Sequence, residues 1–268
     1  MEENESLERP RAPFLEPLPA RSEARIFVLR ETCFEAPLTG RLVSLLSAEE
    51  RERFDRMKYA RVRDEYLATR ALGRLTLARF SGKHPAALRF SPNEWGRPFL
   101  DDPRDLHFNL TNTRGLIACI VGNHAEIGID AEYIDRNTRT IAVADRFFSK
   151  SEVADLMKTA EAEQRRTFFR YWTLKEAYIK ARGMGLAIPL GDFSFSLFSG
   201  NAITVSFTDR IDDDPSTWRF AHHPFGESHF LSTAVRGEGS DVALSIDVID
   251  PARDWVPQLD AWDVRASR

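Results

Sequence analysis

The spacing of apolar residues along the chain predicts helices in some segments and strands in others. Between residues 64 and 80, apolar residues recur every three or four positions, which predicts a helix with one buried face. Gly82 follows this segment and is expected to end the helix. Ser47 and Glu50 have the spacing of a capping box, which predicts the start of a helix over residues 47–57.

Strands are predicted where apolar and polar residues alternate, or where a short run is almost wholly apolar. The alternation is clearest where Leu106, Phe108 and Leu110 are separated by polar residues. The predicted strands cover residues 24–30, 106–111, 115–122, 125–134, 192–198, 201–207, 217–223, 228–235 and 241–249, and further helices cover 140–160 and 163–182. Helices mixed with strands of mostly antiparallel type predict an α+β fold.

Composition narrows the class of protein. The 268 residues are 43% hydrophobic and 29% charged, and the net charge of −4 argues against a general nucleic-acid binder. Residues 1–20 are acidic and proline-rich, which indicates a flexible lead rather than a secretory signal. No apolar run approaches the ~20 residues needed to cross a bilayer. Cys33 and Cys119 are far apart, and Cys119 lies in an apolar run. We therefore expect a buried free thiol there and a cytoplasmic protein.

The segment IGIDAEYID, residues 127–135, contains two carboxylates two positions apart. In a strand, Asp130 and Glu132 share a face, and Gly128 leaves room on that face for something to approach. Two neighbouring carboxylates repel each other unless a cation compensates them. The segment is therefore either a solvated strand face or a site for a hard cation such as Mg²⁺.

The segment RYWTLKEAYIKARGMGL, residues 170–186, contains a third carboxylate. On a helix, Trp172, Glu176 and Lys180 form one stripe with Lys175 beside it. In one interpretation the Glu176–Lys180 pair stabilises the helix by roughly 0.3 kcal/mol and Trp172 lies in the core. In the other, the carboxylate, the two lysines and the glycine-rich exit bind a metal-bridged pyrophosphate.

A third group of residues is basic. Residues 49–79 hold nine Lys and Arg against six Asp and Glu, and Arg70 and Arg74 lie one helical turn apart. Such a group is either a solvated helix face or a site for phosphate, which guanidinium groups bind with two hydrogen bonds. The turn WGRPFL adds Arg97 shortly before the strand that carries Thr111.

Four blocks, in this order, resemble a known family: WGRPFL, HFNLTNT, IGIDAEYID and the run from FFSKSEVADL to FFRYWTLKEAYIKARGMGLAIPL. Together they are similar to the Sfp-type (surfactin-synthetase-activating) 4′-phosphopantetheinyl transferases. The resemblance covers about residues 47 to 196. Its most specific feature is GIDAE followed some forty residues later by WTLKEAYIK.

The resemblance implies roles for individual residues of this chain. The Mg²⁺ ligands would be Asp130, Glu132 and Glu176, and the residues that contact coenzyme A would be Arg53, Arg70, Arg97, Thr111, Asn112, Lys175 and Lys180. The catalytic residues would be Glu176, Lys180 and Glu152, with Glu176 the first candidate for the general base and Glu152 the second. Asn112 stands where the family commonly has histidine. Because asparagine carries no positive charge, we expect phosphate binding to depend more on arginine.

The resemblance also implies a fold and a reaction. The expected fold has two similar α+β halves related by a pseudo-twofold axis, here residues 20–124 and 125–250, with coenzyme A in the cleft between them. The expected reaction transfers phosphopantetheine from coenzyme A to a serine of an apo carrier protein (acyl, polyketide or peptidyl), with release of 3′,5′-ADP. We expect a monomer that binds neither nucleic acid nor membranes. The alternatives are a non-catalytic coenzyme A-binding module and a metal-dependent phosphate-ester hydrolase.

Overall fold

The computed structural model describes residues 15–30, 32–102, 105–135, 140–197, 202–237 and 242–266. The strands are β1 (Glu23–Leu29), β2 (Phe90–Pro92), β3 (Pro98–Leu100), β4 (His107–Thr113), β5 (Leu116–Gly122), β6 (Ile127–Tyr133), β7 (Phe193–Ser196), β8 (Thr204–Phe207), β9 (Trp218–Phe225), β10 (His229–Arg236) and β11 (Ala243–Val248). The helices are α1 (Ala36–Ser44), α2 (Ala48–Asp55), α3 (Ala60–Ser81), α4 (Thr140–Phe147), α5 (Lys150–Lys158), α6 (Glu161–Arg182) and α7 (Val256–Ala266). No helix in these ranges combines the length and apolar character needed to cross a membrane.

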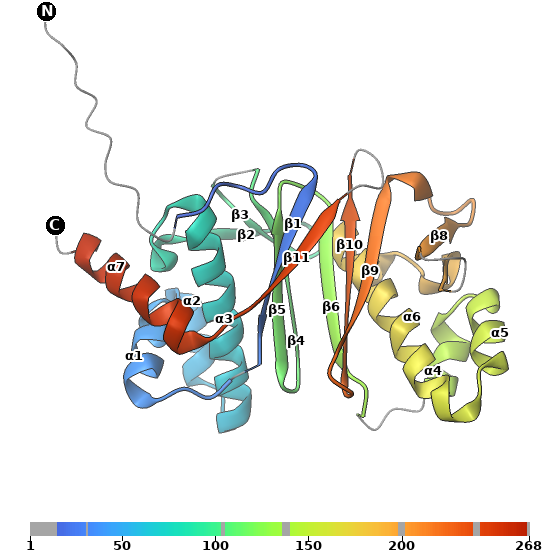
Figure 1. The fold of residues 1–268 in the computed structure, drawn as a ribbon, viewed down its shortest axis with the longest axis horizontal. Coiled ribbons are helices and arrows are strands. Elements are labelled where there is room, and N and C mark those ends of the chain that lie inside the picture. Colours follow the sequence, from blue (N-terminus) through green and yellow to red (C-terminus); the bar gives the residue numbers. More distant parts are fainter. Residues whose placement is uncertain are drawn as a thin grey trace, which may run out of the picture.

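Two sheets occupy the middle of the molecule, and helices lie on its outer sides (Figure 1). The first sheet has the strand order β11-β1-β5-β4, and the second has the order β6-β10-β9. Apolar side chains of β1, β5, β6 and β10 form a core between the sheets, and α3 and α6 each contribute to a separate core on the outer side. The predicted α+β class is therefore confirmed.

Helices α2, α3 and α6 lie where the sequence predicts helices, although α3 begins at Ala60, four residues before the predicted start. Ser47 and Glu50 form the predicted capping box of α2, and Gly82, with a φ of 67°, ends α3. Residues 140–160, predicted as one helical stretch, form two helices, and Ser149 and Glu152 make a second capping box at the start of α5. Helices α1 and α7 were not predicted.

The end of the chain returns to the first sheet. Strand β11 pairs with β1 in parallel, from Glu23 opposite Ala243 to Val28 opposite Val248. Gln258 of α7 then donates a hydrogen bond to the Leu75 carbonyl of α3. Residues 243–248 therefore join the first sheet, beside a strand from the beginning of the chain. The predicted lead 1–20 is described only from residue 15, and Glu16 there forms ion pairs with Arg25 and Arg79.

Candidate active site

Strand β6 turns one face toward the other sheet and the opposite face toward α6. The alternation of the sequence produces this division: Ile127, Ile129 and Ala131 lie in the core between the sheets. The residues that alternate with them, including Asp130 and Glu132, therefore face α6. The two predicted carboxylates thus share a face, and helix α6 covers it.

Gly128 allows α6 to lie directly against this strand. A Cβ atom at residue 128 would be only 2.5 Å from the backbone nitrogen of Ala181, and it would also overlap the carbonyl oxygen of Ala177. The sequence predicted that Gly128 leaves room for a close approach. The group that approaches is the backbone of α6.

The stripe on α6 meets the carboxylates of β6. Lys180 Nζ lies 2.7 Å from Asp130 Oδ1 and also donates to the Ile129 carbonyl at 3.2 Å. One end of the stripe is fixed by Trp172, whose Nε1 donates to Glu132 Oε1 at 3.1 Å. Glu176 lies between Trp172 and Lys180 in the stripe and is half-buried. Structure and sequence agree in bringing these residues to one face.

Side chains of β4 bind the backbone of β6 across the junction of the two sheets. The acceptors are Asn109 Oδ1, Thr111 Oγ1 and Thr113 Oγ1, which bind the N–H groups of Ile129, Ala131 and Tyr133 at 3.2, 3.0 and 3.1 Å. Thr111 also lies 3.3 Å from both Lys180 Nζ and Asp130 Oδ1. Thr111, predicted to contact coenzyme A, is thus a buried support of the Asp130–Lys180 pair.

The carboxylates do not already form a closed metal site. Within the described ranges, no three Asp, Glu, His or Cys side chains come together closely enough to hold a metal ion. Instead, the Lys180 ammonium forms an ion pair with Asp130, whose side chain is only 9% exposed. A cation is therefore already part of this group, as the repulsion between neighbouring carboxylates requires.

Two predicted residues, Lys175 and Glu152, lie away from this face. Lys175 is fully buried, and its Nζ is 2.8 Å from Glu152 Oε2. Burial lowers the pKa of Lys175, and the charge of Glu152 opposes that shift. The predicted contact of Lys175 with coenzyme A and the predicted role of Glu152 as a base both need an accessible group. The structure instead buries both side chains against each other.

Arg97 is also buried, although it was predicted to contact phosphate. It lies in the turn between β2 and β3, and its guanidinium donates to the carbonyls of Ile127, at 3.0 Å, and Ala181. Burial lowers the pKa of Arg97 to about 10, and the nearby charge of Glu126 opposes that shift. Arg97 therefore stays protonated at neutral pH and joins its hairpin to β6 and to the end of α6.

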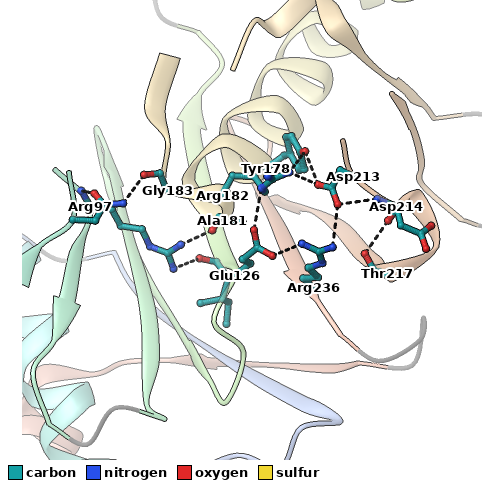
Figure 2. Close-up of polar contacts among 12 residues, drawn as sticks. Arg97, Glu126, Tyr178, Ala181, Arg182, Gly183, Asp213, Asp214, Thr217 and Arg236 are labelled. Atoms are coloured by element: carbon teal, nitrogen blue, oxygen red, sulfur yellow. Dashed lines mark hydrogen bonds and ion pairs between the residues drawn. The ribbon is translucent and has the colours of Figure 1, made fainter. Parts of the chain in front are cut away.

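The last turn of α6 is held from two sides (Figure 2). On one side Arg97 reaches the Ala181 carbonyl. On the other side Arg182 pairs with Glu126 at 2.9 Å and with Asp213, and Arg236 pairs with Glu126 at 2.6 Å. These contacts fix the end of the helix that carries Lys180.

Replacing Arg97 by methionine is expected to lower the free energy of unfolding by about 2–4 kcal/mol, because two buried carbonyls lose a charged donor. Denaturant unfolding measures this loss. Arg89→Met is the control, because Arg89 is an exposed arginine just before β2 and its loss should change stability by less than about 0.5 kcal/mol. If the R97M variant is as stable as the parent but binds coenzyme A much more weakly, Arg97 contacts a phosphate of coenzyme A, as the sequence predicted.

The other two predicted arginines lie on α2 and α3. Arg53 and Arg70 both stack on Tyr66, with guanidinium carbons 5.5 and 5.1 Å from the ring centre. Arg70 is 33% exposed, its Nε lacks a hydrogen-bond partner among the described residues, and Glu50 Oε1 is 3.9 Å away. Asn112 is exposed on β4. Arg53 and Arg70 therefore form a basic group around Tyr66.

The sequence interpretation missed the roles of Asn109 and Thr113. Asn109 had been seen only as a polar residue of a half-buried strand, and Thr113 lay beyond the predicted strand 106–111. The residue types could have revealed these roles. Asn109, Thr111 and Thr113 lie at every second position, and all three have side chains that form hydrogen bonds. Such a row suits a strand edge that meets another strand through side chains.

Residues 126–235 match the model of the 4′-phosphopantetheinyl transferase superfamily. The chain is 33% identical over 171 residues to the 4′-phosphopantetheinyl transferase Sfp of Bacillus subtilis. This alignment covers 63% of this chain and 74% of that protein. It is 35% identical over 149 residues to the 4′-phosphopantetheinyl transferase HetI of a Nostoc species, with 54% and 63% covered. The holo-[acyl-carrier-protein] synthase structure of Thermotoga maritima aligns with a TM-score of 0.35 and 20% identity, covering 42% of this chain and 64% of that one. The matched residues 126–235 include β6 and α6.

Proposed function

This chain belongs to the Sfp-type 4′-phosphopantetheinyl transferases, and we propose that it performs their reaction on the face between β6 and α6. It transfers phosphopantetheine to carrier proteins. In the proposed reaction the donor is coenzyme A, the acceptor is a serine hydroxyl of an apo acyl, polyketide or peptidyl carrier, and 3′,5′-ADP leaves. The observation that carries the proposal is the 2.7 Å contact of Lys180 with Asp130, beside Glu132 and Glu176.

Asp130, Glu132 and Glu176 are the residues that would hold Mg²⁺. Their chemistry fits, because carboxylate oxygens are the ligands that this ion prefers, and because Lys180 already compensates Asp130. When bound there, the ion would draw charge from the pyrophosphate of coenzyme A.

The remaining steps fall to side chains of α6. Lys180 is 29% exposed, so its ammonium can exchange Asp130 for a phosphate oxygen and neutralise charge that develops there. Glu176, half-buried on the same stripe, is the candidate that accepts the proton of the attacking serine. Glu152 is 1% exposed and both of its oxygens accept hydrogen bonds from the backbone, which leaves Glu176 as the better candidate for the base.

The basic group on α2 and α3 suits the 3′-phosphate of coenzyme A. Arg53 and Arg70 share Tyr66, and the buried Nε of Arg70 lacks a hydrogen-bond partner among the described residues. A phosphate oxygen could accept from that N–H, and the exposed Asn112 could add a neutral donor.

Arg70→Ala is therefore expected to raise the KM for coenzyme A by roughly 10- to 100-fold, the loss of one hydrogen bond to a charged group. The KM for 3′-dephospho-coenzyme A should change much less, because that donor lacks the phosphate. Steady-state kinetics with both donors measures the difference. Arg63→Ala is the matched control, because Arg63 is another arginine of α3 but is exposed and stacks on Phe54. An equal loss with both donors would remove Arg70 from the phosphate site.

The proposal also includes two halves related by a pseudo-twofold axis, divided near residue 124, with coenzyme A between them. In support, each half contains a helix with a capping box, α2 and α5, followed by a helix of 22 residues, α3 and α6. Both long helices end at a glycine of positive φ, Gly82 and Gly183. This parallel favours a repeated unit, to whose first copy the returning strand β11 has been added.

The proposed setting is the cytoplasm, with the protein acting as a monomer. Cys33 and Cys119 are both free thiols, which suits a reducing compartment. Burial raises the pKa of the Cys119 thiol, so this group stays protonated and unreactive.

Release of 3′,5′-ADP from coenzyme A, followed with and without an apo carrier, tests the proposed function. A transferase releases ADP only when both the carrier and Mg²⁺ are present. Release without a carrier would indicate a phosphate-ester hydrolase instead. Binding of coenzyme A without any release, across acyl, polyketide and peptidyl carriers, would indicate a binding module.

A further inference from the structure

A buried ion pair occurs at the same place in each half of the molecule. Helices α3 and α6 both span 22 residues, and each carries a cation fourteen residues after its first: Arg74 in α3 and Lys175 in α6. Arg74 is 2% exposed and Lys175 is fully buried. Arg74 Nη2 lies 2.7 Å from Glu50 Oε2, and Lys175 Nζ lies 2.8 Å from Glu152 Oε2.

The two pairs have the same surroundings. Both glutamates are the third residue of a capped helix, where they also accept the backbone N–H of Ser47 and Ser149. Both cations donate to two carbonyls that follow their long helix. The carbonyls are those of Pro85 and Leu88, at 2.8 and 3.3 Å from Arg74 Nη1, and of Leu190 and Phe193, at 2.8 and 2.7 Å from Lys175 Nζ. Each pair therefore joins a capped helix, a long helix and the segment after it.

The first-half pair shows what this arrangement does without a proposed metal ligand beside it. The residue after Arg74 is Leu75, which lies in the apolar core, whereas the residue after Lys175 is Glu176. The first-half pair thus holds a helix in place although the residue next to Arg74 is not a carboxylate. The shared geometry argues for the same work by the second pair.

Hydrogen bonding and burial argue against a direct role for either member. An ammonium group has three protons, and Lys175 Nζ has three acceptors within the protein, Glu152 Oε2 and two carbonyls. Glu152 Oε1 in turn accepts the backbone N–H of Phe195 at 2.9 Å. Lys175 therefore has no proton left for a phosphate oxygen, and burial keeps Glu152 from the solvent and from an attacking serine.

We infer that Lys175 and Glu152 are a positioning pair for Glu176, an inference that rests on the transfer reaction proposed above. Successive residues of a helix point about 100° apart, so fixing Lys175 toward α5 and β7 fixes the direction of Glu176 toward β6. The pair sets the rotation of α6 about its axis and thereby aims the third carboxylate of the site. Neither residue contacts coenzyme A.

The double variant Lys175→Met with Glu152→Gln tests the inference, because it removes both charges and leaves neither buried alone. The expected result is a 10- to 100-fold lower kcat, typical of lost support behind a metal ligand, with a higher Mg²⁺ concentration for half-maximal activity. Binding of coenzyme A measured calorimetrically in EDTA should stay within about twofold of the parent protein, since no phosphate contact is lost. A tenfold weaker affinity in EDTA, or an unchanged kcat and Mg²⁺ requirement, would overturn the inference.

Three further variants keep the test decisive. Lys175→Arg supplies the cation that the first half uses, and its kcat should stay close to that of the parent protein. This variant keeps the buried charge pair, so it still tests the inference if the double variant does not fold. Arg74→Met with Glu50→Gln removes the matching pair and should lower the thermal midpoint without changing the Mg²⁺ requirement. Glu152→Gln alone should keep the shape of the pH–rate profile, and loss of its acidic limb would make Glu152 the base. If the parent protein itself transfers nothing, the proposed function fails instead.

Discussion

Replacing Asp130 by asparagine is expected to lower the rate of phosphopantetheine transfer by on the order of 10³-fold while the protein stays folded. The substitution keeps the shape of the side chain but removes the charge that pairs with Lys180 and that would help to hold Mg²⁺. Stability should fall by only about 1–2 kcal/mol, because Lys180 is partly exposed and water can replace the lost carboxylate. Initial rates of 3′,5′-ADP release and thermal unfolding measure the two effects.

Asp247→Asn is the matched control for this variant. Asp247 is also a strand aspartate paired with a cation, 2.8 Å from Arg25, but it lies on β11 in the first sheet. Its loss should leave the transfer rate within about twofold of the parent. Equal losses of rate in both variants would mean that charge in general, and not the position of Asp130, controls the reaction.

Replacing Gly128 by alanine is expected to lower the free energy of unfolding by about 3 kcal/mol and to remove most activity. The added methyl group would lie 2.5 Å from the Ala181 nitrogen and would also overlap the Ala177 carbonyl, and both obstacles are backbone atoms. The strand and the helix must therefore move apart, which separates Asp130 from Lys180. Chemical denaturation and transfer assays on the same preparation test the two consequences together.

Gly40→Ala is the control for the glycine substitution. Gly40 lies within α1, and a Cβ there would meet no atom within 4 Å. Alanine should stabilise that helix by about 0.5–1 kcal/mol and leave activity unchanged. A G128A protein as stable and active as the parent would show that α6 does not depend on close contact with β6.

The sequence predicted the face between β6 and α6 well because its signals are local. Alternation along residues 127–133 and a spacing of four along α6 each determine which side chains share a face. Gly128 marked the close approach, although the sequence did not say what approaches. The contacts of Lys180 with Asp130 and of Trp172 with Glu132 follow once these two faces meet.

The roles of Arg97 and Lys175 could not be predicted in this way, because their partners are distant in the chain. Arg97 donates to Ile127 and Ala181, which are 30 and 84 residues away. Lys175 differs from Lys180 only in its direction around the helix, and its burial depends on where α5 and β7 pack. The return of β11 to β1 likewise joins residues more than 200 positions apart. Such contacts are properties of the folded core, and no local pattern encodes them.

Intact-mass spectrometry of an apo carrier protein, incubated with coenzyme A, Mg²⁺ and this protein, tests both the transfer and its site. The carrier should gain the mass of one phosphopantetheine group, and EDTA or the D130N substitution should abolish the gain. No gain with any class of carrier, although coenzyme A still binds, would contradict the transfer itself. An equal gain with D130N would contradict the site between β6 and α6.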